Sequence, residues 1–285
     1  METKVKLKGH ESFSIREGWL TKGLVEVNKN GKIFSEKNAT DILGIGTNMV
    51  KSLKYWLITA NLIEEKTKCN YVLSELGQLI YDYDLYMENI FTLYMIHLQI
   101  ALNEEKAYIW NTFFNYCNLK EFTKKEYIDF AEYVLENENK EYNEKLLVDE
   151  IGTFLKTYTN EKKESNPENN FSCPLTELEL IKKNGHDKFQ RTNSSMSKLN
   201  EYIVFWMILH QCGTKDSINI DELITDRNCT AKMLNLDKVE LNEYLEILKR
   251  YKLITINKTA GLNMIYINKR YTLKEIFEHV FKEEK

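Results

Sequence analysis

The segment from Leu43 to Ile63, LGIGTNMVKSLKYWLITANLI, constrains the fold of this chain more than any other stretch. Gly44 and Gly46 predict a tight turn between two helices, because glycine adopts backbone conformations that other residues avoid. Thr47 is a natural cap for the second helix, since its hydroxyl can accept a free backbone amide of the first turn. Apolar residues then recur at spacings of three and four, which predicts one buried helical face. These residues are Val50, Leu53, Leu57 and Ala60.

The residues on either side of this segment complete a pattern typical of a winged helix. Residues 35–43 are predicted to form a short first helix that begins at Ser35. After the glycine turn and the longer helix, a polar stretch and a strand-like Tyr71–Leu73 predict a short wing, and the sequence SELGQLI then begins another helix. Helix, turn, helix, wing and helix follow one another in the order of a winged helix. We therefore expect an N-terminal winged-helix domain over residues 1–83.

The outward side of the longer helix has the chemistry of a DNA-binding surface. Its residues are Thr47, Asn48, Lys51, Lys54 and Tyr55, and no acidic residue occurs from position 43 to position 63. Such side chains can contact phosphates and base edges in a major groove. The alternative is the solvent-exposed face of an ordinary core helix, since winged helices also serve as interaction domains. We expect DNA contact here.

A second group of special residues lies upstream, in the sequence KGHESFSIREGWLTKG from Lys8 to Gly23. Phe13 and Trp19 can form an apolar plug, and His10, Arg16 and Glu17 can form a polar network. This block either fixes the start of a helix or forms an acid/base or phosphate-clamping site beside the recognition helix. The first interpretation is favoured, because catalysis needs a geometry that sequence alone does not give. Two cations of this block, Arg16 and Lys22, join the predicted DNA-binding residues.

The remaining residues predict a mostly helical protein with small β wings. Two prolines and eleven glycines in 285 residues favour helices. Residues 84–160 are expected to form a helical middle domain, with its many aromatic side chains and the lone His97 in the core. Residues 161–198 are predicted to be a linker and docking segment, because residues 160–170 contain no apolar side chain.

Residues 199–285 predict a second winged-helix-like domain of different charge. Its recognition-helix equivalent, residues 237–251, has four acidic residues against three basic ones. Phosphates are repelled by such a surface, so we expect this domain to bind protein through an apolar surface around Tyr244, Leu248 and Tyr251.

Charge and cysteine content limit which partners and which cellular compartment we expect for this protein. The chain has a net charge of −4, but residues 1–63 hold ten Lys and Arg against six Asp and Glu, which is compatible with one local DNA-facing surface. No apolar run reaches the roughly 18–20 residues of a membrane span, and no signal peptide is expected. Five scattered cysteines without a CxxC pair indicate reduced thiols and a cytoplasmic protein without a zinc site.

Three blocks resemble a bacterial family of unknown-function domains found in DNA phosphorothioation gene clusters. They are GHESFSIREGWLTKG (9–23), LGIGTNMVKSLKYWL (43–57) and CPLTELELI (173–181). The best-described branch of that family is the SspB-like component of Ssp systems, which place sulfur on one DNA strand during phage defence. The resemblance implies a protein that acts on DNA beside a cysteine desulfurase, an ATPase and an ATP-pyrophosphatase of the PAPS-reductase type. In the Ssp branch it implies a strand-nicking endonuclease.

The sequence does not identify a catalytic centre. No PD-(D/E)xK, HNH or GIY-YIG motif is present, and no cofactor is evident. Nicking that depends on Mg²⁺ or Mn²⁺ would need clustered carboxylates to hold the metal. Two acidic sets flank the first winged helix, Glu11 with Glu17 and Asp82 with Asp84 and Glu88. Solvated surface roles are the alternative for both sets.

We therefore expect a DNA-binding component of a bacterial DNA phosphorothioation and phage-defence system. The sequence does not decide whether the protein also nicks DNA. The alternatives are a non-enzymatic DNA-binding adaptor that recruits the modification complex and a winged-helix transcriptional regulator. The expected partners are double-stranded DNA and other phosphorothioation-system proteins, and no membrane is expected. The sequence does not decide whether the protein forms a homodimer.

Overall fold

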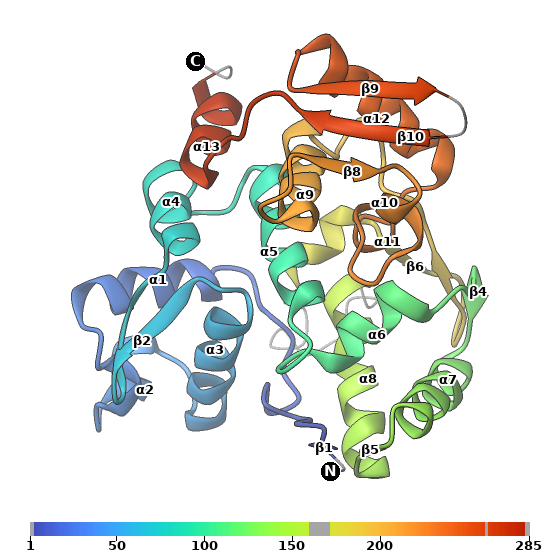
Figure 1. Cartoon of the computed structure of the whole chain (residues 1–285). Helices are drawn as coiled ribbons and strands as arrows, with labels where there is room; N and C mark the ends of the chain where they lie inside the picture. Colours follow the sequence, from blue (N-terminus) through green and yellow to red (C-terminus); the bar gives the residue numbers. More distant parts are fainter. Residues whose placement is uncertain (1–2, 160–171, 260–261, 283–285) are drawn as a thin grey trace. The chain divides into compact units, whose positions relative to one another are not determined.

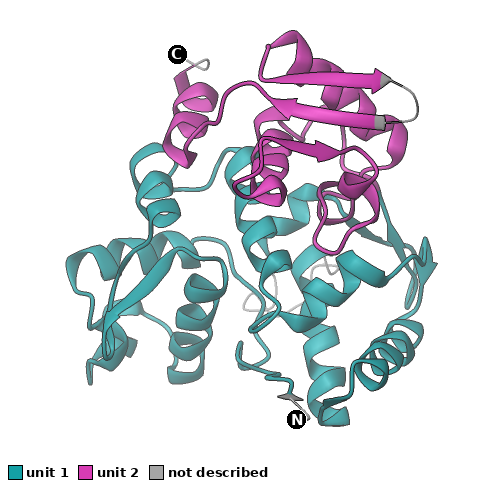
Figure 2. Ribbon diagram, viewed as in Figure 1, with its two compact units in different colours: residues 1–192 teal, residues 193–285 magenta. Residues whose placement is uncertain are grey.

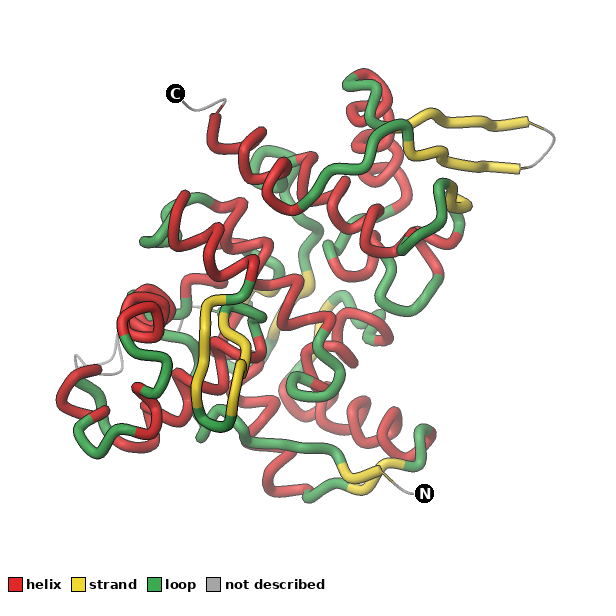
Figure 3. The backbone as a smooth tube through the Cα atoms, turned by 60° about the vertical axis from the view of Figure 1, so that its left-hand side comes forward, coloured by secondary structure: helices red, strands yellow, loops and turns green. Residues whose placement is uncertain are grey.

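The structure of this chain is a computed structural model that describes residues 3–159, 172–259 and 262–282 (Figure 1). It divides into two compact units, residues 1–192 and residues 193–285 (Figure 2). The boundary expected after residue 83 falls inside the first unit, and the start expected at residue 199 falls shortly after the second unit begins. Helices dominate both units, and the sheets among the described residues have only two or three strands (Figure 3). The mostly helical fold class with small β elements is confirmed.

The N-terminal part of unit 1 contains the predicted helices and the predicted hairpin. Its elements are α1 (Trp19–Lys29), η1 (Ile33–Ser35), α2 (Ala39–Leu43), α3 (Thr47–Thr59), β2 (Ile63–Thr67), β3 (Asn70–Leu73) and α4 (Glu75–Tyr83). β2 and β3 pair antiparallel. Ser74 caps α4 by accepting a hydrogen bond from the Gly77 amide.

Two predicted helix starts are corrected by the structure. The helix expected from Ser35 begins at Ala39, because Ile33–Ser35 forms a separate 3-10 turn. Gly46 occupies the cap position of α3, and Thr47 is the first helical residue. The predicted apolar face of α3 is confirmed, since Val50, Leu53, Leu57 and Ala60 are all buried.

The helical middle of unit 1 is built around aromatic side chains, as predicted. Its helices are α5 (Ile90–Leu102), α6 (Tyr108–Tyr116), α7 (Lys124–Asn137) and α8 (Glu144–Tyr158). The Phe113 ring lies 5.2 Å from the Tyr127 ring and 4.8 Å from the Phe154 ring between centroids. His97 is buried, and its Nδ1 lies 2.8 Å from the Tyr158 hydroxyl, which confirms it as a core residue.

Short strands complete unit 1. β1 (Thr3–Lys4) pairs in parallel with β5 (Lys140–Glu141). A three-stranded sheet has the order β4-β7-β6, formed by β4 (Glu121–Phe122), β6 (Ile181–Lys183) and β7 (Phe189–Arg191). η3 (Pro174–Leu178) is a 3-10 helix. The predicted linker, residues 160–170, lies outside the described residues.

Unit 2 consists of five helices among its described residues and a three-stranded sheet. Its elements are α9 (Glu201–Cys212), β8 (Ser217–Asn219), α10 (Glu222–Thr225), α11 (Thr230–Met233), α12 (Lys238–Arg250), β9 (Ile254–Thr259), β10 (Leu262–Ile267) and α13 (Leu273–Lys282). The sheet order is β8-β10-β9. Asp237 begins α12 with a capping box that also uses Glu240. Helices in the described ranges are all too short or too polar to cross a bilayer.

The protein interface predicted on α12 is wrong in its residues. Tyr244 and Leu248 are buried with Leu241 and Leu245 on the inner side of the helix, so they belong to the core of unit 2. The Tyr244 hydroxyl donates a hydrogen bond to the Leu199 carbonyl oxygen at 2.8 Å. Only Tyr251 of the predicted group is exposed, at 52%.

Candidate functional site

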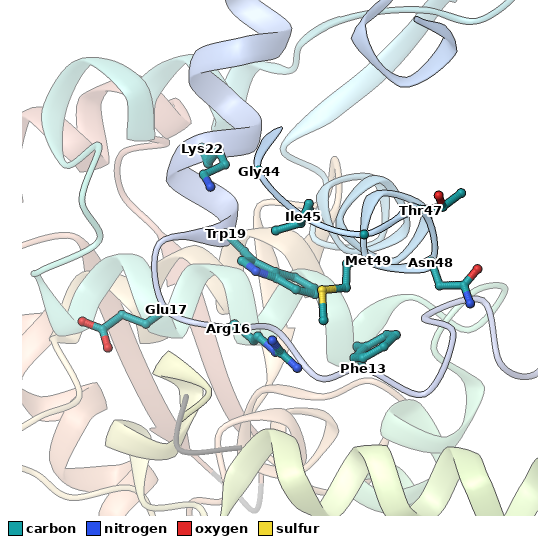
Figure 4. Close-up of a pocket in the computed structure, with 11 residues that line it drawn as sticks. Phe13, Arg16, Glu17, Trp19, Lys22, Gly44, Ile45, Thr47, Asn48 and Met49 are labelled. Carbon is teal, nitrogen blue, oxygen red and sulfur yellow. The ribbon is translucent and has the colours of Figure 1, made fainter. Parts of the chain in front are cut away.

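The two blocks singled out in the sequence meet in one pocket of unit 1 (Figure 4). One wall comes from residues 13–22 and the other from the turn between α2 and α3. The pocket has a volume of about 720 Å³ and includes four of the predicted DNA-binding residues, namely Arg16, Lys22, Thr47 and Asn48. Phe13, Trp19, Ile45 and Met49 supply its apolar surface. The pocket therefore combines cationic, amide and aromatic groups with one carboxylate, that of Glu17.

The turn that forms one wall depends on glycine and on a lysine. Gly44 ends α2 with φ at 61°, a left-handed conformation that favours glycine. The Lys22 Nζ donates a hydrogen bond to the Leu43 carbonyl oxygen at 2.7 Å. No side chain caps α3, and its first turn contains no acid. The positive end of the helix dipole therefore lies at this wall with no carboxylate in the first turn of α3.

Arg16 lies over two aromatic rings at the opposite wall. Its guanidinium carbon is 5.5 Å from the Phe13 ring centroid and 5.4 Å from the Trp19 ring centroid. Figure 4 shows these three side chains side by side at the pocket. Cation–π contacts of this kind fix a guanidinium in place while it keeps its charge. Trp19 is buried, so this part of the pocket wall is also a packed part of the fold.

The wall that carries Arg16 is fastened by a buried polar pair that the sequence analysis missed. His10 and Glu150 are exposed by only 0% and 1%, and His10 Nε2 lies 2.9 Å from Glu150 Oε2. The Ser12 amide donates to His10 Nδ1 at 3.1 Å, so the ring proton is on Nε2, the atom that faces Glu150. The Lys8 amide also donates to Glu150 Oε2 at 2.5 Å. This pair connects the N-terminal segment to α8.

One sequence signal could have indicated Glu150. It lies between Leu147, Ile151 and Phe154, all buried, at the spacing of the apolar face of α8. A carboxylate within an apolar helical stripe indicates a buried polar contact. Its partner could not be identified from sequence, because His10 is far away along the chain.

Tyr55 faces this same cluster, and its predicted outward position is wrong. Its hydroxyl donates to the Lys106 carbonyl oxygen at 2.5 Å, and its ring lies 5.7 Å from the His10 ring. Burial raises the pKa of Tyr55, and the nearby charge of Glu150 raises it further, so the phenol stays neutral. The neighbouring Trp56 stacks on His10 at 5.7 Å and donates its Nε1–H to the Phe13 carbonyl oxygen at 2.9 Å. This side of α3 therefore holds the N-terminal segment.

Gly9 is required by the position of the Tyr55 ring. A Cβ atom at Gly9 would lie 2.4 Å from Tyr55 Cε2, closer than real Cβ contacts allow. The ring cannot easily retreat, because its hydroxyl is bound to the Lys106 carbonyl oxygen.

We expect Gly9→Ala to lower the free energy of unfolding by about 1–3 kcal/mol, the usual cost of overpacking. Urea denaturation measures this change. Tyr55→Leu removes the clashing ring. In a chain that carries Tyr55→Leu, Gly9→Ala should therefore cost less stability than it does in the unchanged chain. Equal stability of Gly9→Ala and the unchanged chain would contradict the close approach.

The two remaining predicted residues lie outside the pocket. The Lys51 side chain is 59% exposed, and its Nζ lies 3.8 Å from Glu11 Oε1. The Lys54 Nζ lies 4.8 Å from the Tyr71 ring centroid, beside β3. Of the seven predicted DNA-binding residues, four therefore line the pocket and two are lysines farther along α3. The seventh, Tyr55, faces the N-terminal segment.

The acidic residues proposed for a metal do not form a metal-binding group. Arg16 and Glu17 also line a second hollow of about 330 Å³, which Glu88 and Glu177 share. Asp84 is engaged in accepting the amides of Glu88 and Asn89. Within the described ranges, no three or more His, Cys, Asp or Glu side chains are arranged to hold a metal ion.

Comparisons with known proteins give one family and one fold. A family model described as "Protein of unknown function (DUF4007)" matches residues 7–282. A magnesium ion-bound SspB crystal structure superposes with a TM-score of 0.85 and 18% identity, covering 99% of this chain and 89% of that chain. An SspB crystal structure gives a TM-score of 0.84 and 19% identity, with the same coverage. No protein of curated function matches. The expected SspB-like resemblance is confirmed at the level of the fold.

Proposed function

This chain belongs to the DUF4007 family, and from this premise we propose that it is a DNA-binding component of a bacterial DNA phosphorothioation system used in phage defence. The observation that carries the proposal is the convergence of Arg16, Lys22, Thr47 and Asn48 in one pocket at the start of α3. These residues come from the two sequence blocks that resemble the family.

The chemistry of the pocket suits a DNA backbone. Arg16 offers a planar set of donors that matches a phosphate. The uncapped first turn of α3 adds backbone amides and a partial positive charge. Lys51 extends the cationic surface along α3 and remains largely exposed. Phosphate contacts of this kind would orient a duplex, and the exposed Asn48 would contact base edges.

The element order supports a winged-helix arrangement at each end. In the first, α2 and α3 are joined by the glycine turn and followed by the β2–β3 hairpin. In the second, α9, β8, α10–α11, α12 and the β9–β10 hairpin follow in order, and β10 pairs with both β8 and β9. In this arrangement α3 and α12 are the two recognition helices.

Lys51→Ala combined with Lys54→Ala should weaken binding of duplex DNA of any sequence. Each lysine that neutralises a phosphate releases counterions. The negative slope of log K against log salt should therefore become shallower by about two in the double variant. Fluorescence anisotropy with a labelled duplex at several salt concentrations measures this slope. The full chain is used, because α3 is held by residues of the helical middle.

The matched control is Lys125→Ala combined with Lys182→Ala. These lysines are exposed on α7 and β6, away from the pocket, and their removal changes the net charge equally. The control should leave the slope nearly unchanged. If both double variants lose affinity equally, a general charge effect replaces the proposed surface.

Three activities of a DNA-binding protein are separated by two further measurements. Incubation with supercoiled plasmid and Mg²⁺ or Mn²⁺ produces open-circular DNA if the protein is a nickase and no such product if it is an adaptor. Footprinting over the promoter of its own operon gives one protected site if the protein is a transcriptional regulator. The proposal requires duplex binding in every case.

A further inference from the structure

The outward side of α12 forms an open hollow in unit 2 that the proposed DNA-binding function does not use. The hollow has a volume of about 650 Å³. The lining residues that matter here are Met196, Val239, Glu243, Glu246, Ile247 and Arg250. All except Met196 fall at spacings of three or four on α12, so they share one side of the helix.

This side of α12 has an apolar floor. Val239 is 66% exposed and Met196 is 40% exposed, and Ile247 is half-buried beside them. The opposite side of the helix already fills the core with Leu241, Tyr244, Leu245 and Leu248. The outward side of α12 therefore places two apolar side chains, Val239 and Ile247, among polar and charged ones. The apolar patch is small, so the charges beside it carry the assignment of a partner.

The charges around this floor select the class of partner. Glu243 and Glu246 lie between Val239 and Arg250, which leaves a net charge of −1 on the lining. Glu246 pairs with Lys249 at 3.2 Å, but both side chains are about half exposed and the pair is weak. Carboxylates on a recognition helix give no counterion release with DNA, so this surface does not suit a phosphate backbone.

We infer that this surface binds an amphipathic helix of a partner protein, with apolar residues on one face and Lys or Arg at its edges. The stretch from Val239 to Arg250 rises by about 16 Å, which matches roughly three turns of a partner helix. Apolar anchors would fill the floor, and the basic residues would pair with Glu243 and Glu246. A second copy of this chain fits less well, because it would bring four carboxylates and two arginines together with a net charge of −2.

The test uses the full chain and a fluorescein-labelled, amidated 14-residue helical peptide with leucines on one face and lysines at its edges. A control peptide has glutamate in place of each lysine. The chain should bind the lysine peptide and prefer it to the glutamate peptide in fluorescence anisotropy. Glu243→Lys with Glu246→Lys should weaken binding of the lysine peptide by at least about tenfold, which is 1.4 kcal/mol. The same variant should gain affinity for the glutamate peptide.

Two further variants make the result specific. Val239→Asp removes an apolar anchor and should also abolish binding of the lysine peptide. Glu222→Lys with Asp226→Lys changes two exposed acids elsewhere on unit 2 and should have little effect. Thermal melting by circular dichroism checks that each variant folds.

Three outcomes would overturn the inference. One is the absence of binding by the unchanged chain. Another is equal peptide affinity in the charge-reversed and unchanged chains. The third is a dimer in analytical ultracentrifugation that Val239→Asp converts to monomer, because a second copy would then cover the surface. None of these results changes the test of DNA binding, which uses α3.

Discussion

Glu150→Ala is expected to lower the free energy of unfolding by about 2–5 kcal/mol, because each of two donors left without an acceptor at a buried site costs about 1–3 kcal/mol. His10 would lose the carboxylate at 2.9 Å and remain enclosed, and the Lys8 amide would lose its acceptor. Urea denaturation followed by circular dichroism measures the loss. Binding of duplex DNA should weaken as well, because the segment that carries Arg16 would no longer be fastened to α8.

Asp149→Ala is the matched control on the same helix. Asp149 pairs with Lys8 at 3.1 Å, but its side chain is about half exposed. An exposed pair contributes about 0–1 kcal/mol, so the control should be nearly as stable as the unchanged chain. Equal losses for the two variants would show that the buried pair has no special role.

Trp19→Ala should cost about 3–5 kcal/mol of stability, since the variant leaves a large cavity in a packed wall. Trp19 is buried at the start of α1, and it supports both the Phe13 ring and the Arg16 guanidinium. The midpoint and slope of a urea unfolding curve report this loss.

Trp19→Phe is the control, because it keeps an aromatic ring beneath Arg16 and should lose less stability. A Trp19→Ala chain that stays fully stable while losing only DNA binding would contradict the packing role. It would instead make the N-terminal block a functional site in its own right.

Local patterns in the sequence predicted much of the fold. The spacing of Val50, Leu53 and Leu57 located the buried face of α3, because helical periodicity depends on neighbouring residues alone. For the N-terminal block the sequence favoured the fixed start of a helix, with a site beside α3 as the alternative, and Arg16 and Asn48 do line one pocket.

Contacts between distant parts of the chain could not be predicted in the same way. Periodicity placed Tyr55 on the outward side of α3, but Gly9, His10 and Lys106 contact its side chain and leave it half-buried. On α12 the sequence indicated an interface with the wrong residues, since Tyr244 and Leu248 lie on the stripe that unit 2 buries. Leu241, Tyr244, Leu245 and Leu248 recur at spacings of three and four, so this stripe already had the pattern of a buried helical face.

The contact between His10 and Glu150 also has a consequence for the order of assembly during synthesis. Translation at about 5–20 residues per second separates the two residues by roughly 7–28 s. During this interval the new N-terminal segment has no partner on α8, and Trp56 of α3 is the partner that can hold it. The pocket residues 13–49 can therefore assemble early in synthesis, whereas the contact between His10 and Glu150 forms only after α8 has left the ribosome.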